Sequence, residues 1–294
     1  MSDQAERLRQ KMQEQQTAKS SSKAKTSAIV SGKGGVGKSN ISVNFSLSLA
    51  SKGYKVLLID FDIGMANIHL LLGTAAEKSI VDYLEDKNLA INDVIVPVST
   101  NLSYIAGGNG LSQIFEMSED YISRLLFGLE ALESDFDYIL FDMGAGATSV
   151  SLHFLLSVDD IIVISTPEPT SITDAYSMIK FITLKDPNST RKFSVICNRA
   201  ESESEGKETM QRLKTASNKF LNIEISALGM LPEDPHVKKS VLKQQPFSLG
   251  FPKAPVSLSL ETVVRNFLSE EDSRVMTMTK TSFLSRLRNL WIER

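Results

Sequence analysis

A glycine-rich segment near the start of the chain has the residue types and spacing of a phosphate-binding loop. It reads SGKGGVGKSN over residues 31–40, and its part from Gly32 to Ser39 matches the pattern G-x-x-x-x-G-K-S. Glycines let backbone N–H groups converge on phosphate oxygens, and the dipole of the following helix favours the same anion. Lys38 is expected to contact the phosphates and Ser39 to bind Mg²⁺. The predicted nucleotide contacts are Gly34, Gly35, Val36, Gly37, Lys38, Ser39 and Asn40. The alternative is an ordinary glycine turn between a strand and a helix.

Carboxylates follow two other apolar segments. Asp60 and Asp62 lie at the end of the run KVLLID and just after it, and Asp142 ends the run YILFD. The carboxyl ends of parallel strands are where an α/β sheet presents its ligand crevice. These three side chains are therefore candidates for the same site as the loop. The alternative is that Asp60 and Asp62 only terminate a strand.

Short apolar runs that alternate with longer helix-like segments indicate how these residues are positioned. The runs are AIVS (28–31), KVLLID (55–60), YILFD (138–142), IIVIST (161–166), FSVICN (193–198) and ISALGML (225–231). Strands that are hydrophobic on both faces imply a parallel sheet covered by helices. The helix after Gly37 is expected to bury Val43, Leu47 and Ala50 on one stripe and to end at Gly53. We predict an α/β fold, a doubly wound, mainly parallel sheet with helices on both faces.

Composition narrows the class of protein. The 294 residues are 42% hydrophobic, which suffices for a substantial core. The chain has 32 basic and 35 acidic residues, so it has no overall positive electrostatic field that would attract a polyanion. No nucleic-acid partner is therefore expected. The single cysteine, Cys197, cannot form an internal disulfide or a cysteine-based metal site. No apolar run approaches the roughly 20 residues that span a bilayer, and we expect a cytoplasmic protein.

The pattern KGGVGKS, residues 33–39, resembles the deviant Walker A motif of the MinD and ParA superfamily. Members of that superfamily are P-loop ATPases that dimerise face to face around two nucleotides, so the resemblance implies ATP or ADP, Mg²⁺ and a homodimer. It also implies that Lys33 reaches the partner's phosphates. A cation supplied in trans would neutralise charge in the transition state and make hydrolysis conditional on assembly. A solvated loop lysine is the alternative.

The same resemblance assigns roles to the carboxylates. Residues 57–73 are similar to the first switch of the superfamily and residues 138–146 to the second. By that similarity Asp62 positions the attacking water, Asp60 supports the magnesium shell, and Asp142 holds a magnesium-bound water. The glycines at 144 and 146 would let the second switch move with the γ-phosphate.

Two later segments are similar to the adenine side of the superfamily. They are CNRA, residues 197–200, and GMLPEDPHVKK, residues 229–239. The resemblance makes Asn198 the leading contact to the base. The further candidates are Arg199, Pro232, Glu233 and Asp234. An asparagine after a strand is also a common turn former, so a purely local role for Asn198 stays open.

The first residues, DQAERLR (Asp3–Arg9), resemble the activating motif of the FlhG family of flagellar-number regulators, MinD relatives in which this motif stimulates the signal-recognition-type GTPase FlhF. The implied partner contacts are Asp3, Gln4, Ala5, Leu8 and Arg9. So short a helix is marginal alone and would fold on its partner. The alternative is a disordered leader with chance periodicity.

The last residues, 281–294, have the pattern of an interfacial helix. At about 100° per residue one apolar stripe forms, and two arginines flank it. The stripe consists of Phe283, Leu284, Leu287, Leu290 and Trp291, and the arginines are Arg286 and Arg288. A terminal helix that packs on its own domain would show the same stripe. The resemblance implies a membrane-targeting helix, and we expect it to dock on the domain in the monomer and to bind anionic lipid in the ATP dimer.

We divide the chain into a flexible N-terminal segment (1–27), a MinD-like ATPase domain (28–269) and a linker with the C-terminal helix (270–294). The expected function is that of a Mg-dependent ATPase, weak alone and dimer-dependent, which associates reversibly with the inner face of the cell membrane. It would stimulate an FlhF-type GTPase, contact flagellar C-ring proteins, and regulate flagellar number and placement. The alternatives are a division-site MinD-type ATPase and a ParA-type DNA-partition ATPase. An iron–sulphur carrier is disfavoured by the single cysteine.

Overall fold

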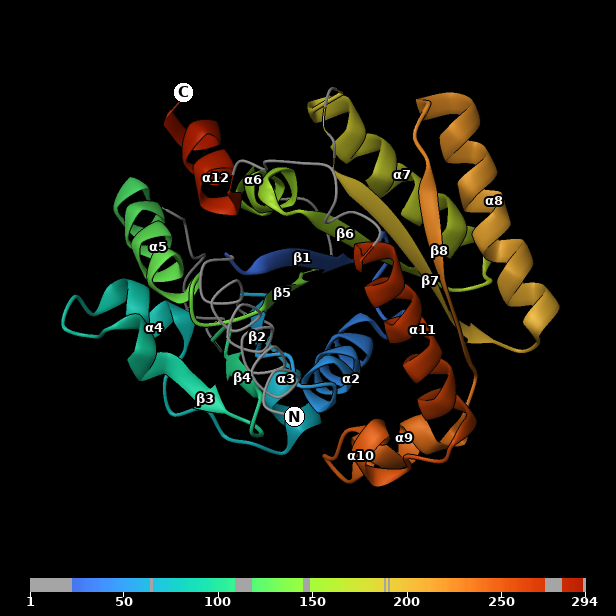
Figure 1. Cartoon of the computed structure of the whole chain (residues 1–294), viewed down its shortest axis with the longest axis horizontal. Coiled ribbons are helices and arrows are strands. Elements are labelled where there is room, and N and C mark those ends of the chain that lie inside the picture. Colours follow the sequence, from blue (N-terminus) through green and yellow to red (C-terminus); the bar gives the residue numbers. More distant parts are fainter. Residues whose placement is uncertain are drawn as a thin grey trace, which may run out of the picture.

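The computed structural model describes residues 23–63, 66–108, 118–144, 149–187, 189, 191–272 and 282–292. Its centre is an eight-stranded sheet in the order β3-β4-β2-β5-β1-β6-β7-β8 (Figure 1). Every pairing is parallel except the antiparallel one between β3 and β4. The strands are β1 (Lys25–Val30), β2 (Val56–Phe61), β3 (Ile95–Pro97), β4 (Leu102–Ile105), β5 (Tyr138–Met143), β6 (Asp160–Ser165), β7 (Lys192–Ala200) and β8 (Ile225–Pro232). The predicted α/β class with a mainly parallel sheet is confirmed.

Helices cover both faces of the sheet, as Figure 1 shows. One hydrophobic core lies under α4 (Ile80–Glu85), α5 (Glu119–Leu132), α6 (Ser149–Ser157), α7 (Pro169–Lys185), α8 (Glu203–Leu221) and α12 (Phe283–Ile292). The core on the other face lies under α2 (Lys38–Ser51), α3 (Ile68–Leu72), α9 (Pro235–Leu242), α10 (Phe247–Gly250) and α11 (Pro255–Asp272). A 3-10 helix, η1 (Ile91–Val94), precedes β3. Among the residues that the structure describes, no helix combines the length and the apolar character needed to cross a membrane.

The order of the strands reverses at β1. The chain leaves β1 for β2 on one side of it, and later passes from β5 to β6, which lies on its other side. Crossovers on both sides of one strand open a crevice at its carboxyl end, where doubly wound sheets bind ligands. The glycine-rich loop begins there, directly after Val30.

More residues of helix α2 are buried than the single apolar stripe predicted from the sequence. Val43, Leu47 and Ala50 are buried, but Ser42 and Asn44 are too, because α10 and α11 cover the side that faces away from the sheet. The helix ends as predicted, since Gly53 follows it with a φ of +91°, a conformation that favours glycine.

Two strands and the start of the fold were missed by the apolar pattern. β3 and β4 are short, and β3 contains a proline, so neither gives a sustained apolar run. β1 begins at Lys25, before the expected domain boundary at residue 28, because its first residues are polar yet pair in register with Tyr138 and its neighbours on β5. At the other end α11 continues to Asp272, beyond the expected boundary at residue 269.

Candidate nucleotide site at the carboxyl ends of the strands

The glycine-rich loop packs closely against two neighbours. Gly37 has a φ of +91°, and a Cβ there would lie 2.5 Å from Nδ2 of Asn198. A Cβ at Gly32 would lie 2.1 Å from the carbonyl carbon of Asp174 in α7. A larger residue would therefore push the loop away from β7 or from α7. By contrast, a Cβ at Gly34 or Gly35 would meet nothing within 4 Å, so this part of the loop borders open space.

Lys38 lies at the first position of α2 and points into the protein. Its side chain is largely buried, and its Nζ donates to Oδ1 of Asp142 at 2.8 Å. The hydroxyl of Ser42, one helical turn later, donates to the same oxygen at 2.7 Å. The other oxygen, Oδ2 of Asp142, is buried and has no hydrogen-bond partner among the described residues. A buried carboxylate oxygen without a donor suits a bound cation or its water.

Strand register brings the predicted carboxylates together. Asp60 on β2 pairs in register with Asp142 on β5, and both are fully buried. Asp60 accepts hydrogen bonds from the backbone N–H groups of Asp62, Asn67 and Ile68. Burial, and then the negative charge of Asp142, raise the pKa of Asp60 from 3.8 to about 7. The free protein therefore holds Asp60 largely protonated below neutral pH.

Asp62 is half-buried and lies just beyond the end of β2, two residues after Asp60. Burial raises the pKa of its carboxyl group, the Lys38 cation opposes the change, and the Asp142 charge adds to it. A Cβ at Gly144 would lie 2.8 Å from Oδ1 of Asp62, so the two predicted switch segments touch. The last two residues of the predicted second switch, Ala145 and Gly146, lie outside the described residues.

These residues fit a magnesium nucleotide better than a metal held by protein alone. Within the described ranges no group of three His, Cys, Asp or Glu residues is placed to hold a metal ion. Mg²⁺ in phosphate-binding sites uses one or two protein ligands, the phosphates and water. Ser39 is partly buried in the first turn of α2, beside Lys38, and Asn40 in the same turn accepts from Nδ2 of Asn44. Ser39 and Asp142 have the hydroxyl and carboxylate oxygens that such a ligand set uses.

Lys33 lies on the outside of the loop. Its Nζ contacts Oε2 of Glu168 at 3.0 Å and Oγ1 of Thr170 at 3.3 Å, both at the start of α7. Its side chain remains 42% exposed, whereas that of Lys38 is 9% exposed. The two lysines of the motif therefore face different surroundings. The sequence analysis missed three residues of this site, Glu168, Thr170 and Ser42. They belong to none of the motifs, and their contacts with Lys33 or Asp142 exist only in the folded chain.

Of the residues predicted for the adenine side, Asn198 contacts the loop. Asn198 donates from Nδ2 to the carbonyl oxygen of Val36 at 2.8 Å, so it braces the loop. Arg199 has a φ of 58°, and its Nε lies 3.9 Å from Oε2 of the exposed Glu233. Asp234, after Pro232, is buried and caps α9 by accepting from the backbone N–H of His236. Asn198 and Asp234 thus make local hydrogen bonds in the structure. Contact with the adenine base stays a prediction for all five residues.

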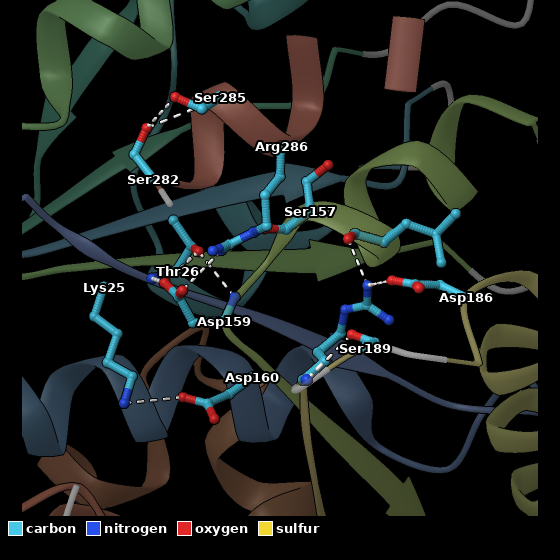
Figure 2. A network of polar contacts seen from close by, with 12 residues as sticks. Lys25, Thr26, Ser157, Asp159, Asp160, Asp186, Ser189, Ser282, Ser285 and Arg286 are labelled. Carbon is cyan, nitrogen blue, oxygen red and sulfur yellow. Dashed lines mark hydrogen bonds and ion pairs between the residues drawn. The ribbon is translucent and has the colours of Figure 1, made fainter. Parts of the chain in front are cut away.

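The C-terminal helix α12 is docked on the domain. Phe283, Leu284 and Leu287 are buried, and the Trp291 ring lies 4.6 Å from that of His153 in α6. Arg286 donates to the carbonyl oxygen of Ser157 and, at 2.7 Å, to Oδ1 of Asp159 (Figure 2).

The docked helix is therefore held by polar contacts as well as apolar ones. Asp159 also accepts from the backbone N–H and the hydroxyl of Thr26 in β1. On the exposed side of the helix, Arg288 pairs with Glu130. Leu290 is partly buried and packs against the core. In the structure, α12 therefore packs on its own domain, which is the alternative that the sequence analysis left open. The N-terminal motif, Asp3–Arg9, lies outside the described residues.

Fold and loop together define a P-loop NTPase with a doubly wound sheet and a two-lysine phosphate loop. The family model of ParA, described as NUBPL iron-transfer P-loop NTPase, matches residues 23–268. A solved structure of the septum site-determining protein MinD with Mg-ADP, from Pyrococcus horikoshii, matches with a TM-score of 0.69 at 24% identity, over 86% of this chain and 100% of that one.

Two curated relatives are more similar in sequence. The chain is 32% identical to antiactivator FleN of Pseudomonas aeruginosa, over 81% of this chain and 84% of that protein. It is 33% identical to the flagellum site-determining protein YlxH of Helicobacter pylori, over 88% of each. The chain belongs to the ParA family, and within it to the MinD-like ATPases of the FlhG (FleN/YlxH) group.

Proposed function

We propose that this protein is a Mg-dependent ATPase that dimerises with ATP and acts as a switch in the control of flagellar number and placement. The observation that carries the proposal is the separation of the two loop lysines. Lys38 is buried against Asp142, where a phosphate would meet it, and Lys33 is exposed. Its pair with Glu168 is exposed as well, and because exposed pairs are worth little, Lys33 can turn from Glu168 to a second protomer.

The chain's own residues have distinct roles in the proposed reaction. Backbone N–H groups of the loop and Lys38 bind the phosphates, and Ser39 and Asp142 hold the magnesium ion, directly or through water. Bound Mg²⁺ would neutralise charge on the transferred phosphoryl group. Asp62, half-buried at the same edge, orients the attacking water. Lys33 supplies a cation to the partner's nucleotide, which couples hydrolysis to assembly.

The flagellar role is supported by the relatives. FleN is named an antiactivator and YlxH a flagellum site-determining protein, and both align over most of this chain. The iron-transfer description of the matched family finds no support in the residues. Cys197 is the only cysteine, it is buried, and burial raises the pKa of its thiol to about 11, which disfavours the thiolate that a cluster needs.

We further propose that α12 alternates between the domain and an anionic membrane surface. Its buried residues Phe283, Leu284 and Leu287 are those of the predicted lipid-facing stripe, so one contact excludes the other. Helix α6 begins just after the second switch segment, and its last residue, Ser157, accepts a hydrogen bond from Arg286. A nucleotide-dependent movement of that switch would therefore reach α12 through α6.

Residues 3–9 are proposed to stimulate an FlhF-type GTPase, with flagellar C-ring proteins as a further class of partner. The basis is the sequence motif alone. The protein would then work in the cytoplasm and reversibly at the inner face of the cell membrane.

The decisive experiment compares Lys33→Ala with the wild type in ATP hydrolysis and in sedimentation with ATP and with ADP. Wild type is expected to dimerise with ATP and to hydrolyse it, and Lys33→Ala to lose about 100-fold in rate because the trans cation is missing. Lys55→Ala is the control, since this exposed lysine precedes β2 at the opposite edge of the sheet. Undiminished pairing and hydrolysis in Lys33→Ala would refute the shared site.

A further inference from the structure

Ser42 is a fully buried hydroxyl in α2 that belongs to none of the nucleotide motifs. We propose that Ser42 is a positioning residue for the magnesium site, which holds the carboxylate of Asp142 when a nucleotide draws Lys38 away. The proposal rests on the Mg-nucleotide function above, and it adds a residue that the phosphate-loop and switch patterns do not contain.

The geometry places two donors on one oxygen. Oδ1 of Asp142 accepts from Oγ of Ser42 at 2.7 Å and from Nζ of Lys38 at 2.8 Å. The Ser42 hydroxyl has one proton, and the carbonyl oxygen of Lys38 is a second acceptor for it at 3.1 Å; the shorter contact is the one to Asp142. Fixing Oδ1 fixes the direction of Oδ2, which is buried and has no hydrogen-bond partner in the described part of the chain.

A bound nucleotide changes the balance between these donors. The phosphates carry several negative charges, and Lys38 is the loop lysine that has to turn its ammonium group toward them. Asp142 then loses a donor while it stays fully buried, and a buried carboxylate without donors is costly. Within the described residues Ser42 is the other side chain that donates to Asp142. It therefore keeps Oδ1 satisfied and Oδ2 aimed at the metal.

Residues that orient a metal ligand contribute to metal affinity without touching the metal. The contribution of Ser42 should accordingly appear in nucleotide binding that depends on Mg²⁺, and not in nucleotide binding without it. This difference separates a positioning role from a general role in packing α2.

The chain offers a matched control in the same helix. Ser46 lies one turn after Ser42, is also fully buried, and donates its hydroxyl to the carbonyl oxygen of Ser42 at 2.7 Å. Ser42→Ala and Ser46→Ala each remove one buried hydroxyl from α2. Only the first removes a donor to Asp142.

The experiment measures ADP affinity by calorimetry with Mg²⁺ and with EDTA, in full-length wild type, Ser42→Ala, Ser46→Ala and Ser42→Thr. We expect Ser42→Ala to reduce the enhancement of affinity by Mg²⁺ by about tenfold or more, with little change in EDTA. Ser46→Ala should retain the full enhancement, and Ser42→Thr should retain most of it because its hydroxyl remains.

Three results would decide against parts of this account. An unchanged Mg²⁺ enhancement in Ser42→Ala would overturn the positioning role. A loss in Ser46→Ala or Ser42→Thr as large as that in Ser42→Ala would also overturn it, because helix packing would then explain the effect. A wild-type protein without any Mg²⁺ enhancement would instead contradict the proposed function itself.

Discussion

Asp60 and Asp142 are two buried carboxylates side by side, and the protein neutralises them in different ways. Asp142 has the Lys38 cation and the Ser42 hydroxyl, whereas Asp60 has three backbone N–H donors and, in the described part of the chain, no ion pair. The pKa of Asp60 is therefore raised to about 7, and protonation removes the repulsion between the pair. Two buried carboxylates beside one lysine suit a divalent cation.

The raised pKa of Asp60 predicts a loss of stability as pH rises. Because the native state keeps this proton and the unfolded state releases it above pH 3.8, the contribution of Asp60 is complete below that value and is lost by about pH 7. The loss should be on the order of 2–4 kcal/mol. Urea unfolding of nucleotide-free wild type and Asp60→Asn over this range isolates the effect as the difference between their free energies of unfolding. A difference that does not change with pH would exclude it.

At the scale of elements, α12 is the helix whose position has the clearest consequence. Its apolar face covers α6 and α5, and Arg286 reaches the amino ends of β1 and β6 through Asp159 (Figure 2). The Arg286 cation helps to hold the pKa of the Asp159 carboxyl below its usual value against the opposing effect of burial. The ion pair is therefore a specific part of the docked state, beyond the burial of apolar side chains.

Weakening this ion pair should shift α12 toward lipid. Asp159→Asn removes the negative charge and leaves every residue of α12 unchanged, so flotation with anionic vesicles in ADP should rise several-fold, toward the wild-type level in ATP. Glu130→Gln is the matched control, because the exposed pair of Glu130 with Arg288 is worth little. If wild type floats equally well with ATP and with ADP, the proposed alternation of α12 is wrong.

At the scale of the molecule, the nucleotide site and the α12 anchor lie at opposite edges of the sheet. The loop follows the carboxyl end of β1, and Lys25 and Thr26, at its amino end, belong to the polar network around Asp159 and Asp160. Helix α6 runs between the two edges. The sheet thus separates the candidate nucleotide site from the polar network that anchors α12.

The N-terminal residues should act on a GTPase independently of the ATPase core. We expect the full-length protein to accelerate GTP hydrolysis by an FlhF-type GTPase, a variant without residues 1–22 to lose this effect, and a peptide of residues 1–20 to restore it in part. A peptide of the same composition in scrambled order is the control. No acceleration by the full-length protein or the peptide would leave a MinD-like switch without this activity.

Much of the site was predictable because its information is local. The spacing of glycines and lysines in residues 32–39 specifies a loop whose backbone can wrap phosphate, and continuous apolar runs specify buried strands. Carboxylates at the ends of two such runs had to meet at one edge of a parallel sheet. The register of Asp60 with Asp142 bears this out.

Other features depended on contacts between residues far apart in sequence. The surroundings of Ser42, the pairing of Lys33 with Glu168, and the capping role of Asp234 follow from helices brought together by the fold. The amphipathic pattern of α12 suited a membrane and a protein core equally, since both accept an apolar stripe. Its docking was decided by shape and by one partly buried carboxylate, Asp159, placed to receive Arg286. A one-dimensional pattern records which faces are apolar, whereas only the three-dimensional structure decides what each face meets.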